Sequence, residues 1–209
     1  MNAKPDMRFR RLRKKGSRNF ELACAILDAS RICHVGFTLE NQPYVVPMAL
    51  ARDEAQLLMH GSVVSRLVTN LADGLPCCVT VTHIDGLVLA RSAFNSSMHY
   101  RSVMVFGCAE AVTDPGRKER GLNILTDHLA PGRLADVRPS TRKELNATTL
   151  LTLPIRDFTV KVSNGPPDDP AADVKAPIWA GVIPLSLQAG PPQPAPDMDP
   201  SIPLPPYLQ

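Results

Sequence analysis

The chain lacks the features that would place it in a membrane or in a disulfide-rich class of proteins. No apolar run approaches the roughly 18 residues needed to span a bilayer, and no apolar stretch follows the basic N-terminus as in a signal peptide. Its five cysteines form no Cys-x-x-Cys pair, and the adjacent Cys77 and Cys78 would point to opposite faces of a strand. We therefore expect a cytoplasmic protein with reduced, mostly buried thiols and no metal site.

Sequence motifs of several common catalytic sites are also absent. The chain contains neither Gly-x-Gly-x-x-Gly nor a Walker A loop, which argues against a Rossmann or P-loop nucleotide site. Gly-x-Ser-x-Gly and His-Glu-x-x-His are missing as well, so no nucleophilic serine or zinc protease site is indicated. Of the five histidines, His34 and His83 fit sheet or core positions better than catalytic ones.

Positive charge is concentrated at the start of the chain. Residues 1–18 hold eight Lys or Arg and a single Asp, so the remaining residues carry a net charge of −4. Such an arm is typical of a flexible, solvated terminus, and less often it binds nucleic acid or an anionic surface. Because the body of the chain is mildly acidic, the pattern argues against nucleic acid as the partner.

Proline is concentrated at the other end, where residues 166–209 hold 13 of the chain's 21 prolines. Proline has no amide donor, so these runs form neither a helix nor a central strand. We expect a basic arm over residues 1–18, one folded domain over residues 19–185 and an extended tail over residues 186–209. The tail is either loose or wrapped around a partner subunit, whereas apolar residues over 176–185 indicate a docked segment.

Between the two ends the pattern is dominated by strands. Periodicity and capping residues predict helices over residues 19–30, 63–72, 115–129 and 140–147. Alternating and β-branched runs predict strands over residues 32–39, 44–51, 56–60, 76–84, 87–94, 102–112, 150–155 and 158–162. Residues 40–43 form a turn signal, and Asp85-Gly86 is a strong hairpin signal. Together these elements indicate a mainly β, α+β fold: an antiparallel barrel with peripheral helices.

The segment from His60 to Arg66 is a candidate anion site. A strand ends at His60, Gly61 provides a tight turn, and Ser62 occupies the expected N-cap of the next helix. Free amides at a helix start attract anions, while Ser62 and Ser65 offer hydroxyls and Arg66 can grip a phosphate. An ordinary capped helix with a surface arginine explains these residues equally well.

A second candidate is the polar and aromatic stretch over residues 91–103, which we expect to be a long loop. Loops of this length in a small domain are often functional. Tyr100 and Arg101 are suited to stacking on a planar ring or pairing with a phosphate. The alternative is a surface loop whose arginines pair with local carboxylates.

Five runs of residues occur in the order typical of one known family: residues 32–37, 60–66, 80–92, 100–103 and 179–184. They resemble the FMN-binding proteins of the pyridoxamine 5′-phosphate oxidase-like family, and within it the branch related to nitroimidazole-resistance proteins. The likeness extends over about residues 12–185. It implies an FMN-binding split β-barrel that forms a homodimer, with two FMN molecules at the subunit interface.

The resemblance also implies roles for individual residues. The segment that lines the flavin phosphate is matched by His60, Gly61, Ser62, Ser65 and Arg66, and a segment near the cofactor by Tyr100, Arg101, Ser102 and Val103. Pro47 and Met48 are expected to face the isoalloxazine ring, and Trp179 to cover it, from the same or the other subunit. Asn95, His99 and Ser163 differ from the residues common in the family, so the substrate is not indicated.

These expectations favour an FMN-dependent oxidoreductase that acts on a small molecule, with an electron donor such as NAD(P)H. Because the flavin supplies the redox chemistry, the lack of an acid–base constellation is no obstacle. Two alternatives stay open: a flavin-binding protein without turnover, and a haem-binding or haem-degrading protein with a histidine ligand.

Overall fold

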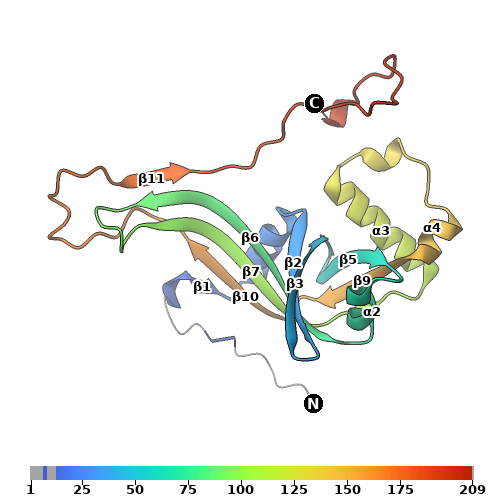
Figure 1. Cartoon of the computed structure of the whole chain (residues 1–209), viewed down its shortest axis with the longest axis horizontal. Helices are drawn as coiled ribbons and strands as arrows, with labels where there is room; N and C mark the ends of the chain where they lie inside the picture. Colours follow the sequence, from blue (N-terminus) through green and yellow to red (C-terminus); the bar gives the residue numbers. More distant parts are fainter. Residues whose placement is uncertain (1–6, 9–12, 209) are drawn as a thin grey trace.

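The structure, a computed structural model, describes residues 7–8 and 13–208, and it contains two antiparallel sheets with helices around them (Figure 1). Sheet A has the strand order β1-β10-β7-β6-β2-β3, with β11 also paired to β6. Its strands are β1 (Gly16–Ser17), β2 (Ile32–Leu39), β3 (Gln42–Ala49), β6 (Pro76–Leu89), β7 (Ser97–Cys108), β10 (Asp157–Ser163) and β11 (Gly181–Pro184). Sheet B has the order β4-β5-β9-β8, formed by β4 (Ala51–Asp53), β5 (Gln56–Ser62), β9 (Thr148–Pro154) and β8 (Glu110–Ala111).

Of the four α-helices described, all but the second begin directly after a side chain that caps them. The four are α1 (Phe20–Asp28), α2 (Arg66–Ala72), α3 (Pro115–Leu129) and α4 (Arg142–Ala147), with short 3-10 turns η1 (Arg13–Lys15), η2 (Arg133–Ala135) and η3 (Pro206–Leu208). The Asn19 side chain accepts a hydrogen bond from the Leu22 amide at 2.8 Å, and Asp114 accepts one from the Arg117 amide at 2.7 Å. Within the part of the chain that the structure describes, no helix has the length and apolarity to cross a membrane.

The main core lies between the two sheets and explains their alternation. Val35 on β2, Val79 on β6 and Val160 on β10 are completely buried against Met59 of β5, and α1 adds Ile26 from the side. A smaller cluster lies on the other face of sheet B, beneath α3, and consists of Ala51, Leu58, Leu125 and Leu150. This arrangement confirms the predicted split barrel with peripheral helices.

The Asp85-Gly86 dipeptide does not form the predicted hairpin. β6 runs unbroken through it, and the register with β7 shifts there, which marks a β-bulge. A Cβ atom at position 86 would lie 3.0 Å from the carbonyl oxygen of Ile183 and 3.2 Å from Val182 Cγ1, both on β11. The glycine therefore allows β11 to approach closely, and the two strands predicted on either side of it are one.

The chain instead reverses direction at residues 90–96, so the predicted long loop over residues 91–103 is also wrong. β7 begins at Ser97 and ends at Cys108, and the chain then crosses to sheet B as β8. The predicted strand over residues 102–112 is thus split between two sheets. Gly107 allows a close approach between the two sheets, because a Cβ there would lie 2.9 Å from Leu153 Cδ1.

Two further boundaries differ from the prediction. The turn at residues 40–43 is shortened to Glu40 and Asn41, whose φ angles of 50° and 63° are left-handed and close a two-residue hairpin between β2 and β3. The helix predicted over residues 63–72 begins three residues late, at Arg66, with Ser65 as its N-cap.

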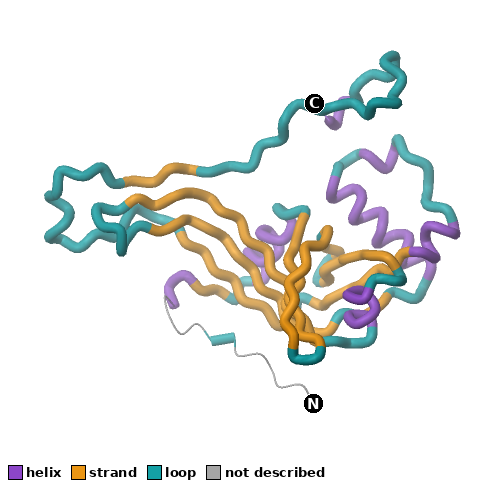
Figure 2. The backbone as a smooth tube through the Cα atoms, viewed as in Figure 1, coloured by secondary structure: helices purple, strands orange, loops and turns teal. Residues whose placement is uncertain are grey.

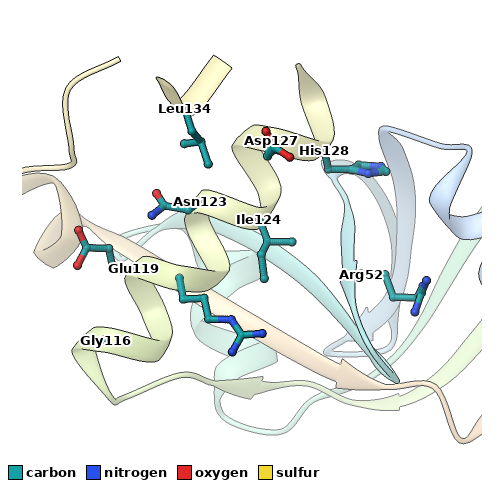
Figure 3. A pocket seen from close by; sticks show the side chains of 9 residues that line it. Arg52, Gly116, Glu119, Asn123, Ile124, Asp127, His128 and Leu134 are labelled. Atoms are coloured by element: carbon teal, nitrogen blue, oxygen red, sulfur yellow. The ribbon is translucent and has the colours of Figure 1, made fainter. Parts of the chain in front are cut away.

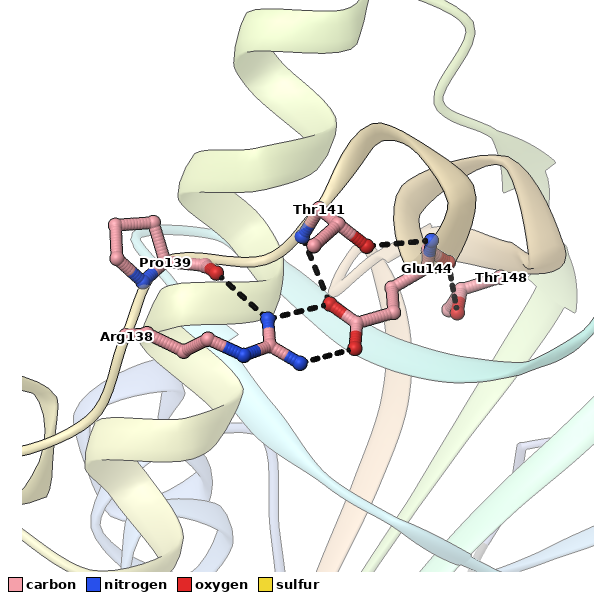
Figure 4. A network of polar contacts seen from close by, with 5 residues as sticks. All are labelled: Arg138, Pro139, Thr141, Glu144 and Thr148. Carbon is pink, nitrogen blue, oxygen red and sulfur yellow. Dashed lines mark hydrogen bonds and ion pairs between the residues drawn. The ribbon is translucent and has the colours of Figure 1, made fainter.

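The short helix α4 is held by a polar network on the surface (Figure 4). Thr141 and Glu144 form a capping box, in which each side chain accepts from the other residue's backbone amide. Arg138 adds two contacts to the Glu144 carboxylate, at 2.6 and 2.9 Å. The Arg138 guanidinium and the Thr141 backbone amide lower the pKa of Glu144 to about 2.

Strand pairing begins before residue 19 at the N-terminal end of the domain and reaches β11 at the C-terminal end. Residues 1–6 and 9–12 of the predicted basic arm lie outside the described residues, but Gly16 and Ser17 pair with β10 and Lys15 Nζ donates to Ser163 Oγ at 2.8 Å. At the other end β11 pairs with β6, in agreement with the docked segment predicted over residues 176–185. The tail beyond it runs as an extended chain (Figure 2).

Close packing of α3 on sheet B predicts opposite effects for two alanine substitutions in that helix. A Cβ at position 121 would collide with the fully buried Leu150 side chain, whereas at position 116 the nearest atom, Asp114 Oδ1, is 3.5 Å away. Gly121→Ala should lower the free energy of unfolding by about 1–3 kcal/mol, and Gly116→Ala should raise it by about 0.5 kcal/mol through helix propensity. Urea unfolding measures both, and an equal gain from the two changes would contradict the packing.

Candidate functional site

The turn that joins β5 to α2 places two serines and an arginine at one end of the barrel. The Ser65 amide donates to the Ser62 carbonyl at 2.9 Å, and the Val63 amide donates to the Ala147 carbonyl at 3.1 Å. Ser62 is therefore the last residue of β5 and not the N-cap predicted for it, because this turn separates strand from helix. Ser65 is the N-cap, and its hydroxyl makes no capping bond.

Arg66 stands over an aromatic ring at the start of α2. Its guanidinium carbon lies 5.2 Å from the centre of the Tyr44 ring, which itself stacks on Phe37. The guanidinium thus lies over the ring, and the Arg66 side chain is exposed. We call Tyr44, Ser62, Ser65 and Arg66 the cationic corner; it offers two hydroxyls and a charged fork to an anion.

His60 and Gly61, predicted to line the same place, face opposite sides of sheet B. A Cβ at Gly61 would lie 2.6 Å from Val68 Cγ2, so this glycine admits α2 against the strand rather than making a turn. His60 points the other way, on the same face as Leu58, because side chains alternate along a strand. Its Nδ1 is buried without a hydrogen-bond partner, and burial lowers the pKa of the imidazole.

The predicted residues on β7 also divide between two faces. Tyr100 and Ser102 lie on the outer face of sheet A, where they line a hollow of ≈ 290 Å³. We call this the sheet hollow; its other lining residues are Met104, Phe106, Thr159 and Lys161, with Met7 and Arg8 from the N-terminal segment. Val103 lies on the inner face and is completely buried in the core, so its side chain does not reach this hollow.

Arg101 is held by a carboxylate of its own chain. Its Nε and Nη2 donate to the two Asp85 oxygens at 2.8 and 2.7 Å, across the paired strands β6 and β7. The guanidinium lowers the pKa of Asp85. Arg101 therefore stiffens the hairpin at the bulge, and its two best-placed donors are already used.

Pro47 and Met48 are neighbours in sequence but not in space. Met48 is buried in the core, whereas Pro47 is exposed on the outer face of β3. There it is the first residue of a row that crosses five strands, in which each residue lies directly opposite the next on the paired strand: Pro47, His34, Thr80, Met104 and Thr159. We call this the open row; at about 4.8 Å per strand it spans about 19 Å and ends in the sheet hollow.

Trp179 lies away from the other predicted residues of its own chain. Its ring packs on Gly181 at the start of β11 and stays 65% exposed. Figure 1 shows β11 at one end of the molecule and α2 in its other half, so Trp179 does not cover the cationic corner of the same chain. Asp169 stabilises this end, since its side chain is 2% exposed and pairs with Arg91 at 2.8 Å.

Another pocket, of ≈ 620 Å³, lies along α3 (Figure 3) and contains none of the predicted residues. Both of its arginines already have partners in this chain: Arg52 binds Asp28 and Arg120 contacts Asp53. His128 Nε2 hydrogen-bonds to the Ser30 carbonyl at 2.7 Å. The pocket therefore offers fewer polar side chains that are available to bind a ligand than the cationic corner or the open row.

The structure thus gathers six of the twelve predicted residues into two places: Ser62, Ser65 and Arg66 in the cationic corner, and Pro47, Tyr100 and Ser102 on the outer face of sheet A. They meet only at β3, the edge strand of that sheet, whose inner side carries Tyr44 and whose outer side carries Pro47. Sequence reasoning missed Tyr44, Lys161 and the open row. Alternation along β2 and β3, paired across the turn between them, could have placed His34 and Pro47 on one face. The sequence does not show the order of the other strands.

A family model of pyridoxamine 5′-phosphate oxidase matches residues 21–162, which is more than half of the chain. This chain belongs to that family. The resemblance noted in the sequence is therefore confirmed at the level of family and fold. A search of curated proteins gives no match.

Solved structures of family members show how far the likeness extends. The FAD and heme binding protein from Mycobacterium smegmatis is 42% identical, with a TM-score of 0.89, over 92% of this chain and 95% of that chain. The flavocytochrome Anf3 from Azotobacter vinelandii is 38% identical, with a TM-score of 0.90, over 96% and 93%. A putative 5-nitroimidazole antibiotic resistance protein from Bacteroides thetaiotaomicron is 24% identical over 70% and 86%, with a TM-score of 0.60, and shares the fold.

The pairing of Arg101 with Asp85 predicts a stability change at low pH. Because Arg101 lowers the pKa of Asp85 in the folded state, the stabilisation is present above the ordinary value of 3.8 and is lost as the pH falls through the lowered folded pKa. Asp85→Asn should cost about 0.5 kcal/mol at pH 7, since the pair is about one-third exposed. Its unfolding free energy should also depend less on pH below 4 than that of the wild type.

Asp53→Asn is the matched control, because Asp53 contacts a mostly exposed Arg120 at 3.3 Å. Asp53→Asn should leave the unfolding free energy at pH 7, and its dependence on pH below 4, almost unchanged. Urea unfolding at several pH values compares the two variants, and identical profiles would show that the Arg101 pair adds nothing.

Proposed function

We propose that this family member is a homodimeric redox protein that binds a flavin and haem and passes electrons between them. The observation that carries the proposal is the likeness over nearly the whole chain, at 42% and 38% identity, to two proteins named for these cofactors. The proposal keeps the flavin-dependent oxidoreductase predicted from the sequence and joins to it the haem alternative. A small-molecule donor such as NAD(P)H supplies the electrons.

The cationic corner is the part that fits the phosphate end of a flavin. The Ser65 hydroxyl makes no capping bond, and the exposed Arg66 guanidinium lies over the Tyr44 ring. Charge-assisted hydrogen bonds of this kind are the strong ones in phosphate recognition. Because the 42% identical protein is named for FAD, we propose FAD in place of the FMN predicted from the sequence.

Two histidines fit the haem iron better than the other three. His83, His99 and His128 each use Nε2 to contact a backbone carbonyl, at 2.9, 2.7 and 2.7 Å, which leaves only the Nδ1 atom next to the Cβ branch. A planar macrocycle approaches that crowded nitrogen poorly. His34 stands exposed in the open row, and burial favours the neutral, ligating form of His60.

When bound, the flavin takes up an electron pair from its donor and haem exchanges single electrons. The chain's own contribution is to hold the two groups near one another and away from water. Arg66 would balance phosphate charge, the serine hydroxyls would donate hydrogen bonds to it, and one imidazole would bind the iron. The apolar Pro47 and Met104 of the open row would provide a surface for a planar ring.

A second copy of the chain is needed to complete this arrangement. The ends of β6 and β7, with β11 beside them, form an arm whose exposed side chains include Ile84, Leu87, Met98, Trp179 and Ile183. Apolar groups gathered on one surface of a soluble protein mark an interface. A two-fold axis relating two copies would bring the arm and Trp179 of one chain to the cationic corner of the other.

The absorption spectrum of the purified or reconstituted protein tests the function. We expect the two visible flavin bands together with a Soret band, and chromatography of the released flavin should give FAD. NADPH added without oxygen should bleach the flavin and then reduce the haem. Flavin bands that never bleach with either pyridine nucleotide would favour the binding protein without turnover, and a protein that takes up no flavin would overturn the proposal.

Single histidine variants separate the two candidate ligands of the iron. Either His34→Ala or His60→Ala should remove the Soret shift of bound haem and leave the flavin bands unchanged. His99→Ala is the control, because its Nε2 is used by the Gly165 carbonyl. If both candidate variants keep the spectrum of the wild type, neither histidine is the ligand.

Removal of the charge at the cationic corner should weaken flavin binding selectively. Arg66→Gln should raise the dissociation constant of the flavin by about tenfold or more, as expected for a lost charge-assisted hydrogen bond. Arg156→Gln removes another exposed arginine of the same chain and should leave affinity unchanged. Flavin fluorescence quenching by the apoprotein measures both, and equal affinities would exclude Arg66 from the site.

A further inference from the structure

The Pro-rich tail is fixed at both ends and free between them. It leaves sheet A after β11 and ends in η3, beside the turn that follows α3 (Figure 1). Every residue from Ile183 to Leu204 is exposed, and Leu187 is 100% exposed. We call residues 185–206 the strap.

The far end of the strap is held by one tyrosine. The Tyr207 hydroxyl donates to Asp136 Oδ2 at 2.6 Å and accepts from Arg133 Nη1 at 3.1 Å. Its ring packs on Gly132, where a Cβ would lie only 3.4 Å from Tyr207 Cγ. Gly132 has a φ of 88°, a left-handed conformation that glycine adopts readily, and the Tyr207 ring packs against the backbone at this turn. We call these four residues the latch.

Between β11 and the latch, the hydrogen bonds of the described strap residues stay within the strap, apart from the one that the Leu185 amide donates to the Asp85 carbonyl at its start. An extended chain with so few contacts gains nothing that offsets the entropy of ordering it. Proline reduces this cost, but it does not provide the missing attraction. The latch therefore stabilises an ordered strap only if the chain between the two anchors contacts another molecule that it encloses.

We propose that the strap encloses a second copy of this chain, so that each protomer of the dimer holds its partner with a latched C-terminal strap. The inference rests on the homodimer of the proposed function and deepens it. The strap starts at the arm, and its first apolar side chains, Leu185 and Leu187, continue the exposed apolar series of Trp179 and Ile183 without a break. The same partner surface therefore covers arm and strap.

The C-terminal half of the strap faces the latch across a hollow. Residues between 192 and 208, together with Arg133 and Asp136, line this hollow of ≈ 960 Å³, whose walls are mainly proline, leucine, isoleucine and methionine side chains. Because a two-fold dimer contains every contact twice, two straps act together. A fivefold weakening at each latch then becomes about 25-fold in the dimer dissociation constant.

Thiol protection in the intact protein tests whether the strap lies against a partner. In a Cys108→Ser background, which removes the exposed native thiol, Leu187→Cys should react with maleimide at least about tenfold more slowly than Lys143→Cys. Such protection corresponds to an opening cost above about 1.4 kcal/mol. Lys143 is an exposed position on α4 and serves as the matched reference. Tyr207→Ala should abolish the protection, whereas Asp197→Asn, on the strap but outside the latch, should not.

Analytical ultracentrifugation and the flavin spectrum of the same samples separate the possible failures. Dimeric protein in which position 187 reacts as fast as position 143 overturns the strap and leaves the proposed function intact. Flavin-loaded protein that sediments as a monomer overturns the strap and the homodimer together. A dimer whose dissociation constant rises about 25-fold in Tyr207→Ala, with the flavin spectrum retained after reconstitution, supports the latched strap.

Discussion

The pairing of β6 with three other strands holds together the open row and the arm. Its first half pairs with β2 and carries the open row, and its second half pairs with β11 and forms the arm. The bulge at Gly86 joins the two halves. Before it the odd-numbered Val79 and Val81 are buried, and beyond it the even-numbered Val88 is buried. The extra residue thus keeps one buried face along the whole strand while it bends the arm away from the barrel.

Strand alternation also decides what the predicted site residues do. Neighbours in sequence, such as Pro47 and Met48 or His60 and Gly61, lie on opposite faces of their sheets, so a contiguous motif cannot line one pocket through its side chains. One member of each pair packs the core or admits a helix. The motif therefore combines residues that shape the barrel with residues that are free to bind a ligand, and only the structure separates them.

The sequence predicted best what is decided locally. The caps Asn19, Asp114 and Thr141 place three helices, because a side chain and an amide three residues apart suffice to start a helix. The hairpin at Asp85-Gly86 failed because the glycine there is required by β11, a strand that comes far later in the chain. The site was predicted in part for the same reason: its residue types are visible in the sequence, but the open row depends on the order of five strands.

The cationic corner and the open row meet at the edge strand β3. The residues of this strand explain why we expect it to contact a ligand and a second copy of the chain, and not a further strand. Edge strands expose unpaired backbone groups and invite further pairing. Pro43 and Pro47 have no amide to donate, so β3 is poorly suited to accept a further strand. Its side chains are nevertheless open on both sides, with Val45 68% exposed next to Pro47 and Arg66 over Tyr44 on the inner side. A ligand with an anionic end and a flat apolar end fits both sides of this strand: the anionic end would bind Arg66 on the inner side, and the apolar end would cover Pro47 on the outer side. A second protomer would then shield the ligand from water.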